Sequence, residues 1–309
     1  MAQTRPGTTS RRPGSPRRGG PPRGRPPGGR GRPGPAGAGA PQIGRIVIPI
    51  ALVVVVVLAL VLVKVLGGSG SSSPSASTTD AAAPAGVVDA VQNVPPSEFS
   101  VVGVPSSVTN PPKLTSASTP ILMANGKPQL VYVGAEYCPY CATERWAVAV
   151  ALSRFGTWSG LKTTTSSASD VYPSTNTLSF YGSTYTSQYL TFTSTEETTN
   201  QPSGSGYKTL ENPTPLENQL ITKYDPSAGI PFIDIGNRYI VSTTYSPQVL
   251  QGKSWSNIAS ALSNPNDPIT QGIIGSANLI DAAICQITNN QPASVCSSPE
   301  IQAAKGHLG

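Results

Sequence analysis

Two cysteines separated by two residues, Cys138 and Cys141, form the pattern in this chain best suited to covalent chemistry. They follow an apolar, β-branched run at 129–134, typical of a buried strand, and precede a run at 142–156 that predicts a helix with one apolar face, which includes Trp146. Pro139 suits the first helical position, which places Cys138 at the N-cap. There the unpaired N–H groups and the helix dipole favour a thiolate, so we expect Cys138 to attack a disulfide and Cys141 to resolve the mixed disulfide.

Two other roles for this pair are open. A structural disulfide can span a C-x-x-C, in which case the pair takes no part in exchange. A zinc site usually needs a second such pair or histidine ligands, and the only histidine, His307, lies in the C-terminal tail. We therefore expect no metal, no cofactor and no catalytic role for His307.

The other two cysteines, Cys285 and Cys296, bracket the end of a predicted helix and a loop that contains Pro292. An even number of cysteines suits a compartment in which disulfides form. A structural bridge between Cys285 and Cys296 is the main prediction, and it would stabilise the fold by about 2–4 kcal/mol. A second redox pair that passes electrons to the first is the alternative.

Acidic and aromatic residues surround the first cysteine pair. Glu136 and Glu144 flank it and are candidates for relaying a proton to the resolving cysteine. Glu136, in the strand-to-helix turn, is the better candidate, because a glutamate at position 144 is ordinarily a helix residue that faces solvent. Tyr137 and Tyr140 border the thiols and either line a substrate groove or are ordinary exposed aromatic residues.

The rest of the sequence predicts an α/β fold with a mixed sheet. The stretch 160–200 is rich in Thr, Ser and Tyr with patches of alternation, which predicts strands and loops. Further predicted elements are a helix at 215–224, two strands at 230–241 joined by a turn at Gly236 and Asn237, and helices at 254–262 and 269–289.

The net charge of +6 is distributed unevenly along the chain. Residues 1–45 contain ten Arg, ten Pro and twelve Gly but no Asp or Glu, so they cannot bury enough apolar surface to fold and are predicted to be a disordered tail. These arginines do not indicate nucleic-acid binding, because they lie in that tail. The apolar run 46–66, with Lys64 near its end, is long enough for one membrane-spanning helix.

A cleaved signal peptide is the competing interpretation of this run. The run is longer than the apolar region of such a peptide, and the residues after it, 67–70, read Gly-Gly-Ser-Gly, so we predict an uncleaved anchor. The arginines before it place the N-terminus in the cytoplasm. The predicted organisation is a cytoplasmic tail (1–45), a single-pass span of the cell membrane (46–66), a flexible linker (67–86), a folded extracytoplasmic domain (87–300) and a C-terminal tail (301–309).

Three segments, 134–156, 229–240 and 284–296, are similar to a prokaryotic, often membrane-anchored family called domain of unknown function 929. More broadly, the chain resembles the thioredoxin superfamily, in which a strand leads to a C-x-x-C that opens a helix, and a proline begins a later strand. That proline is cis in the superfamily and faces the dithiol. The resemblance implies a thioredoxin-like mixed sheet flanked by helices, and it gives this role to Pro231, with the backbone of Ile230 binding an extended substrate.

These features together predict a membrane-anchored thiol–disulfide oxidoreductase. It would act on protein thiols or disulfides, exchange electrons with a further partner and bind no nucleic acid. The alternative is a non-catalytic thioredoxin-like domain that binds a peptide or a membrane partner and keeps Cys138 and Cys141 as a permanent disulfide.

Overall fold

The structure is a computed structural model that describes residues 80–309. The predicted tail, the predicted span and most of the predicted linker lie outside the described residues. Within 80–309, no helix combines the length and the apolar character needed to cross a membrane.

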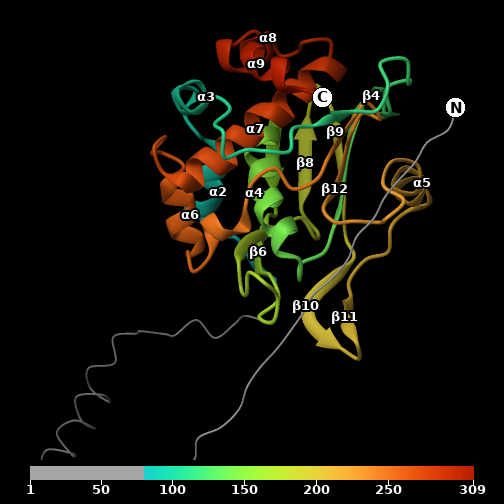
Figure 1. Ribbon diagram of the computed structural model, residues 1–309, viewed down its shortest axis with the longest axis vertical. Helices are drawn as coiled ribbons and strands as arrows, with labels where there is room; N and C mark the ends of the chain where they lie inside the picture. The colour runs from blue at the N-terminus through green and yellow to red at the C-terminus, as the bar shows by residue number, and fades with distance from the viewer. Residues whose placement is uncertain (1–79) are drawn as a thin grey trace, which may run out of the picture. The chain divides into compact units, whose positions relative to one another are not determined.

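Groups of strands and groups of helices follow one another along the described chain (Figure 1). The helices are α2 (Ala85–Gln92), α3 (Pro96–Val102), α4 (Pro139–Ser153), α5 (Pro215–Tyr224), α6 (Trp255–Ala261), α7 (Pro268–Ile287), α8 (Ala293–Cys296) and α9 (Pro299–Ala304), with 3-10 turns η1 (Pro247–Leu250) and η2 (Lys305–His307). The strands are β1 (Ala81–Ala82), β2 (Lys113–Leu114), β3 (Met123–Ala124), β4 (Lys127–Gly134), β5 (Gly156–Ser159), β6 (Lys162–Thr165), β7 (Asn176–Ser179), β8 (Thr184–Ser187), β9 (Thr191–Glu196), β10 (Thr198–Ser203), β11 (Gly206–Thr209), β12 (Phe232–Ile235) and β13 (Tyr239–Val241).

The largest sheet is mixed, as predicted, and is built around β4. β4 pairs in parallel with β9 and antiparallel with β12, and β13 and then β2 continue the sheet beyond β12. Gly134 at the end of β4 therefore lies beside Glu196 in β9, and Val133 lies beside Phe232 in β12. The segment after β4, which carries the cysteine pair, leaves the sheet next to the start of β12.

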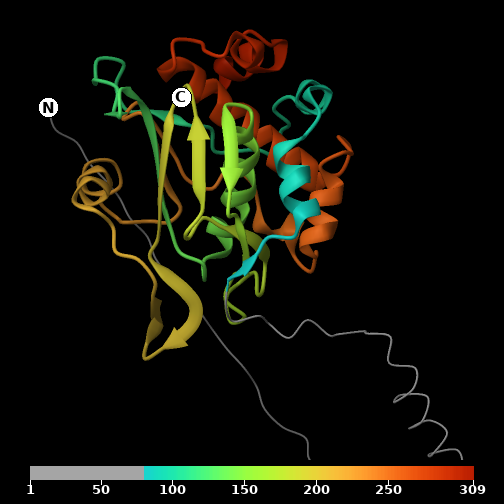
Figure 2. The same ribbon diagram turned by 180° about the vertical axis from the view of Figure 1, so that it is seen from behind.

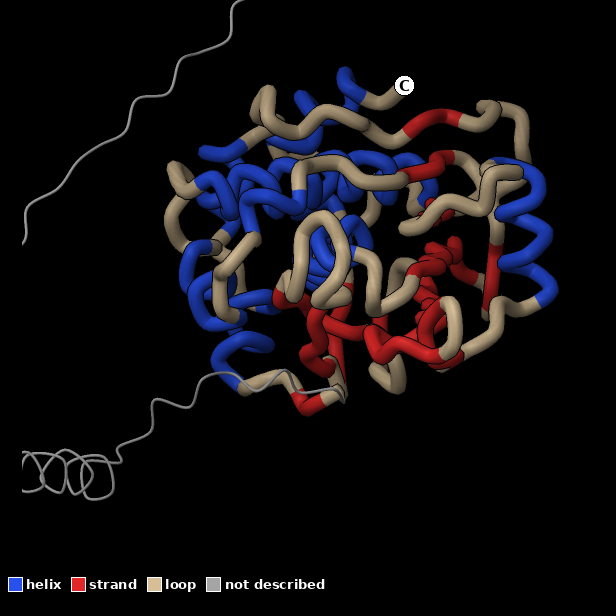
Figure 3. The backbone as a smooth tube through the Cα atoms, turned by 60° about the horizontal axis from the view of Figure 1, so that its bottom comes forward, coloured by secondary structure: helices blue, strands red, loops and turns tan. Residues whose placement is uncertain are grey.

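Both faces of this sheet are covered by helices. Leu130 and Tyr132 of β4 belong to the main core, which includes α4 and α7, whereas Val131 and Val133 pack against Leu220 of α5 on the other face. Figures 1 and 3 show α5 alone on one side of the strands and the other helices on the opposite side. Burial on both faces explains why the β4 sequence is continuously apolar instead of alternating.

The helix starts follow the residues that the sequence offers as caps. Cys138 caps α4 and accepts the backbone N–H of Cys141, with Pro139 in the first turn. Thr214 and Glu217 form a reciprocal capping box at the start of α5. Such caps satisfy N–H groups that the helix cannot bond internally, so α4 and α5 begin at defined residues.

Helix α4 differs from the sequence prediction of one apolar face. Thr143, Glu144 and Arg145 are as completely buried as Trp146 on the predicted apolar face. The reason is that α4 lies between the sheet on one side and α7 and α2 on the other (Figure 1). A helix enclosed in this way buries polar residues too, and each of these then needs a partner.

The folded part of the chain is also longer than predicted. Ala81–Ala82, within the predicted linker, pair with β6, and α2 begins at Ala85. At the other end, α9 and η2 occupy most of the predicted tail 301–309, and Gly309 accepts the backbone N–H of Leu114 at 2.6 Å. Backbone pairing with the rest of the fold, which composition does not reveal, holds both segments.

Three smaller sheets complete the fold: β1-β6-β7, β5-β8 and the hairpin β10-β11. They confirm that the stretch 160–200 forms strands and loops. The hairpin, yellow in Figures 1 and 2, extends from the end of the sheet at which α4 begins. The backbone N–H of Glu136 donates to Thr198 at the base of the hairpin at 2.9 Å, so β10 starts next to the cysteine pair.

Candidate functional site

Cys138 lies at the junction of the main sheet, helix α4 and the segment before β12. Its sulfur accepts the backbone N–H of Cys141 at 3.4 Å and lies 3.8 Å from the carbonyl oxygen of Ile230. The peptide bond between Ile230 and Pro231 is cis, as the resemblance implies. The structure therefore places the cysteine pair beside Ile230 and the cis Pro231, which lie far from it in the sequence. The resemblance predicted this proximity.

The two thiols have different environments. Cys138 is 5% exposed and its pKa is lowered, first by a hydrogen bond from Cys141 and further by backbone N–H groups and the charge of Arg145, against the cost of burial. Cys141 is fully buried, and burial together with the neighbouring Cys138 raises its pKa well above its ordinary value. Both are free thiols in the structure. These opposite pKa shifts distinguish a nucleophile from a resolving thiol.

Glu136 is buried two residues before Cys138. Burial and a hydrogen bond with the carboxyl group of Asp80 raise its pKa to about 8, while the hydroxyl of Ser179 donates to it at 2.8 Å. Glu136 therefore carries a proton through most of the neutral range. A carboxyl group that holds its proton near neutral pH has the property that a proton relay requires.

The expectation that Glu144 faces solvent is wrong. Its carboxylate is fully buried and accepts the backbone N–H of Thr244 at 2.6 Å and the Thr244 hydroxyl at 2.8 Å. Burial raises its pKa to about 7. These contacts connect α4 to the segment that follows β13.

Four tyrosines from three segments lie around the cysteine pair. Tyr137 stacks on Tyr207 of the β10–β11 hairpin with ring centroids 4.3 Å apart, and Tyr140 meets Tyr172 edge to face at 6.1 Å. Tyr140 is 39% exposed, so its ring reaches the surface beside the thiols. The sequence identified Tyr137 and Tyr140 but not their partners, because nothing in the local pattern shows that the hairpin folds back to this point.

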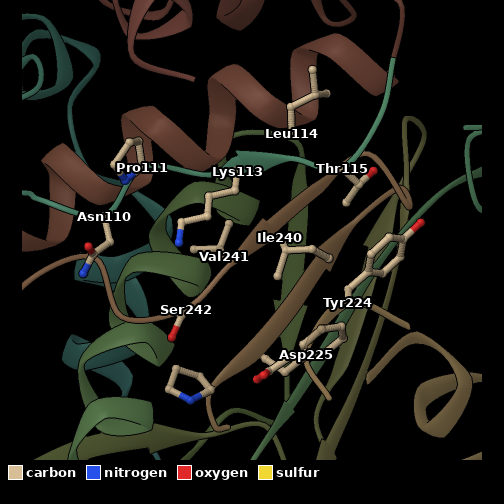
Figure 4. Close-up of a pocket in the computed structure, with 12 residues that line it drawn as sticks. Asn110, Pro111, Lys113, Leu114, Thr115, Tyr224, Asp225, Ile240, Val241 and Ser242 are labelled. Atoms are coloured by element: carbon tan, nitrogen blue, oxygen red, sulfur yellow. The ribbon is translucent and has the colours of Figure 1, made fainter. Parts of the chain in front are cut away.

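A cavity of about 530 Å³ is lined in part by Pro231 and by neither thiol. Its lining combines apolar side chains with one ammonium and one carboxylate group, from Lys113 and Asp225, which reach it from β2 and the end of α5 (Figure 4). The residues that line it are Asn110, Pro111, Lys113, Leu114, Thr115, Tyr224, Asp225, Pro231, Phe232, Ile240, Val241 and Ser242.

A buried ion pair lies beneath the cysteines and was not anticipated. Arg145, one helical turn after Cys141, donates two hydrogen bonds to Glu196 of β9, at 2.7 and 2.6 Å, and neither side chain is exposed. The signal in the sequence is two adjacent charged residues, Glu144 and Arg145, directly before the apolar stretch of the helix that follows the C-x-x-C.

The second pair of cysteines is bonded, which confirms the predicted disulfide. The sulfurs of Cys285, near the end of α7, and Cys296, at the end of α8, are joined, and the Cα atoms are 5.5 Å apart. His307 is exposed in η2. Among the described residues, no group of three or more Cys, His, Asp or Glu side chains could hold a metal ion.

The chain belongs to the family described as Domain of unknown function (DUF929), whose model matches residues 113–286, more than half of the sequence. This confirms the family that the sequence motifs indicated. The match includes Cys138, Cys141, Pro231 and Cys285 and ends before Cys296. No curated protein and no solved structure matches the chain.

Proposed function

We propose that this protein is a thioredoxin-like thiol–disulfide oxidoreductase, held at the outer face of the cell membrane by residues 46–66. The observation that carries the proposal is the position of the Cys138 sulfur. It lies between the first N–H groups of α4 and the carbonyl oxygen of Ile230, which precedes the cis proline. A strand, a C-x-x-C that opens a helix and a cis proline facing it are the features shared with the thioredoxin superfamily.

The exchange begins when the Cys138 thiolate attacks one sulfur of a substrate disulfide. The bond between the two substrate sulfurs breaks, one leaves as a thiolate, and Cys138 and the other form a mixed disulfide. The Cys141 thiolate then attacks Cys138, which releases the second substrate sulfur and leaves a disulfide between Cys138 and Cys141. Two electrons have passed from the dithiol to the substrate, and the reverse sequence oxidises a substrate dithiol.

Three further groups take part. The backbone of Ile230, held by Pro231, pairs with an extended substrate segment, and Tyr137 and Tyr140 contact its side chains. Glu136, protonated near neutral pH, exchanges a proton with Cys141. Glu144 is a weaker candidate for this role, because its carboxylate is already hydrogen-bonded to Thr244.

The test is the reduction of insulin disulfides and the oxidative refolding of a reduced protein by the purified full-length chain. Cys138→Ser is expected to abolish both activities. The matched control is a Cys285→Ala, Cys296→Ala double variant, which removes the same kind of side chain away from the proposed site and is expected to retain them. Activity in Cys138→Ser equal to that of the wild type would rule out the proposal.

Binding of a peptide without exchange is a second candidate, favoured by the cavity beside Pro231. Thiol trapping at set redox potentials separates the two. A Cys138–Cys141 couple that titrates above about −300 mV supports exchange, whereas a pair that stays oxidised down to that potential supports binding alone.

A further inference from the structure

Arg145 places a permanent positive charge directly beneath the dithiol. Side chains of a helix lean toward its N-terminus, so a residue four positions after Cys141 extends back over the turn that carries Cys141. Arg145 is completely buried, and its charge lowers the pKa of both Cys138 and Cys141. The effect is opposite to that of burial, which raises the pKa of each thiol.

Glu196 is the counter-ion of this charge. It is the last residue of β9 and pairs in register with Gly134, the last residue of β4 before the dithiol segment. Its two carboxylate oxygens accept Nε and Nη2 of Arg145. The remaining guanidinium nitrogen, Nη1, is buried and has no hydrogen-bond partner among the described residues. Glu196 thus neutralises the Arg145 charge on one side of the guanidinium group, and Nη1 remains as a donor on the other side.

Tyr132, Glu136 and Glu211 are other titratable groups near this ion pair. The hydroxyl of Tyr132 in β4 is buried, which raises its pKa well above its ordinary value. Glu136, with a pKa of about 8, is mostly protonated and hydrogen-bonds to Asp80, in the segment that precedes β1.

A carboxylate oxygen of Glu211 accepts the backbone N–H of Glu196 at 2.8 Å, and burial raises the pKa of Glu211. Arg145 is thus the cation whose charge reaches both thiols, and Glu196 is its direct counter-ion.

We propose that Arg145 stabilises the thiolate form of the dithiol, that Glu196 limits this effect, and that the balance between the two sets how oxidising the Cys138–Cys141 couple is. The inference rests on the proposed function and adds which residues set its redox equilibrium. Stabilising the reduced form of a dithiol makes its disulfide a stronger oxidant. Arg145 touches no substrate, so it is a positioning residue that acts through the thiols.

Two variants of the ion pair test the proposal, because they have opposite effects on charge. Arg145→Gln removes the cation, so we expect the pKa of the thiols to rise. We also expect the equilibrium with glutathione to shift about tenfold toward the protein disulfide, because a change of one pKa unit corresponds to a tenfold change in an equilibrium constant. Glu196→Gln leaves the cation uncompensated, and we expect a shift of similar size toward the dithiol. Arg145→Lys keeps the charge and should remain close to the wild type.

A purely structural ion pair predicts a different result. Removing either partner would then destabilise the fold and move the equilibrium in the same direction, or leave it unchanged, and either outcome overturns the proposal. Arg154→Gln is the matched control. It breaks the ion pairs with Asp281 and Glu300 at the other end of α4 and should lower stability without changing the thiol pKa.

The measurements are the pH dependence of thiol alkylation and the equilibrium with glutathione, in full-length protein checked for folding by circular dichroism. If Arg145→Gln does not fold, the sign for Glu196→Gln decides, since a shift toward the disulfide or no shift overturns the proposal. A wild-type dithiol that does not titrate at all contradicts the proposed function itself. A wild-type dithiol that titrates, with variants that do not shift it, contradicts only the inference.

Discussion

The backbone N–H of Cys141 donates a hydrogen bond of 3.4 Å to the sulfur of Cys138. This is an N-cap interaction in which the capping atom is itself the reactive atom, so the group that starts α4 also stabilises the Cys138 thiolate. Cys141, about one turn further along α4, is fully buried and does not cap the helix. The order of the two thiols in the proposed exchange follows from this single helical turn.

Cys138 is therefore expected to react with iodoacetamide before Cys141. Its lowered pKa gives a thiolate at a lower pH, and at neutral pH we expect alkylation about tenfold faster than that of an ordinary thiol. Mass spectrometry of the alkylated peptide, over a range of pH, identifies the modified residue. Cys141→Ser should keep the fast phase and Cys138→Ser should lose it; equal rates at both cysteines would contradict the assignment.

Glu136 should make the domain less stable as the pH rises. Its pKa is about 4.5 in an unfolded chain and about 8 in the fold, so the folded state binds the proton more tightly. The stability that this proton provides is complete below about pH 4.5 and is lost as the pH rises through 8. Glu136→Gln, which cannot ionise, should be more stable than the wild type at pH 8 by about 1–3 kcal/mol and similar to it at pH 4.

Urea unfolding of both proteins at pH 4, 6 and 8 measures this difference. Asp89→Asn is the matched control, because it makes the same kind of change at an exposed carboxylate in α2, away from the cysteine pair. A constant difference between Glu136→Gln and the wild type would show that folding does not shift the pKa of Glu136, and would contradict the prediction.

The strand and helix pattern around the site could be predicted from the sequence because it depends on local signals. The run before Cys138, Pro139 in the first turn of α4, and the turn at Gly236 between two apolar runs each specify an element without reference to distant residues. The observed α4, α5, β12 and β13 begin or end within a few residues of the predicted positions.

What the sequence could not reveal depends on which elements pack together. The burial of Glu144 and Arg145 follows from α7 and β9 lying against α4, and both elements are distant in sequence. Periodicity marks apolar residues, but a charged residue in a helix is assigned to the surface unless its partner is known. The stacking of Tyr207 on Tyr137 was missed for the same reason.

The Cys285–Cys296 disulfide should contribute to stability and not to exchange. It closes a short loop between the end of α7 and α8, and both cysteines are fully buried. Replacing both with Ala is expected to lower the free energy of unfolding by about 2–4 kcal/mol while the alkylation rate of Cys138 stays unchanged. Denaturant unfolding and the alkylation assay measure the two effects, and a change in the Cys138 rate would point to the alternative of a second redox pair.

Gly134, the last residue of β4, is expected to accept no larger side chain. A Cβ atom here would lie 2.7 Å from Cζ of Tyr132, whose ring is fully buried and packs edge to face on Phe180. Gly134→Ala should therefore destabilise the domain by about 1–3 kcal/mol, the usual cost of overpacking. Gly206→Ala is the matched control, because no atom lies within 4 Å of its added Cβ.

Tyr132→Phe shows how much of this clash is due to the Tyr132 hydroxyl and how much to its ring. The Tyr132 hydroxyl is buried and has no hydrogen-bond partner among the described residues, so removing it alone should cost less than about 1 kcal/mol. Because that hydroxyl is the atom nearest to the added Cβ, Tyr132→Phe should recover part of the stability lost in Gly134→Ala, and the double variant should be more stable than Gly134→Ala alone. Strictly additive losses, measured by denaturant unfolding of the four proteins, would show that the strand relieves the clash by moving its backbone instead.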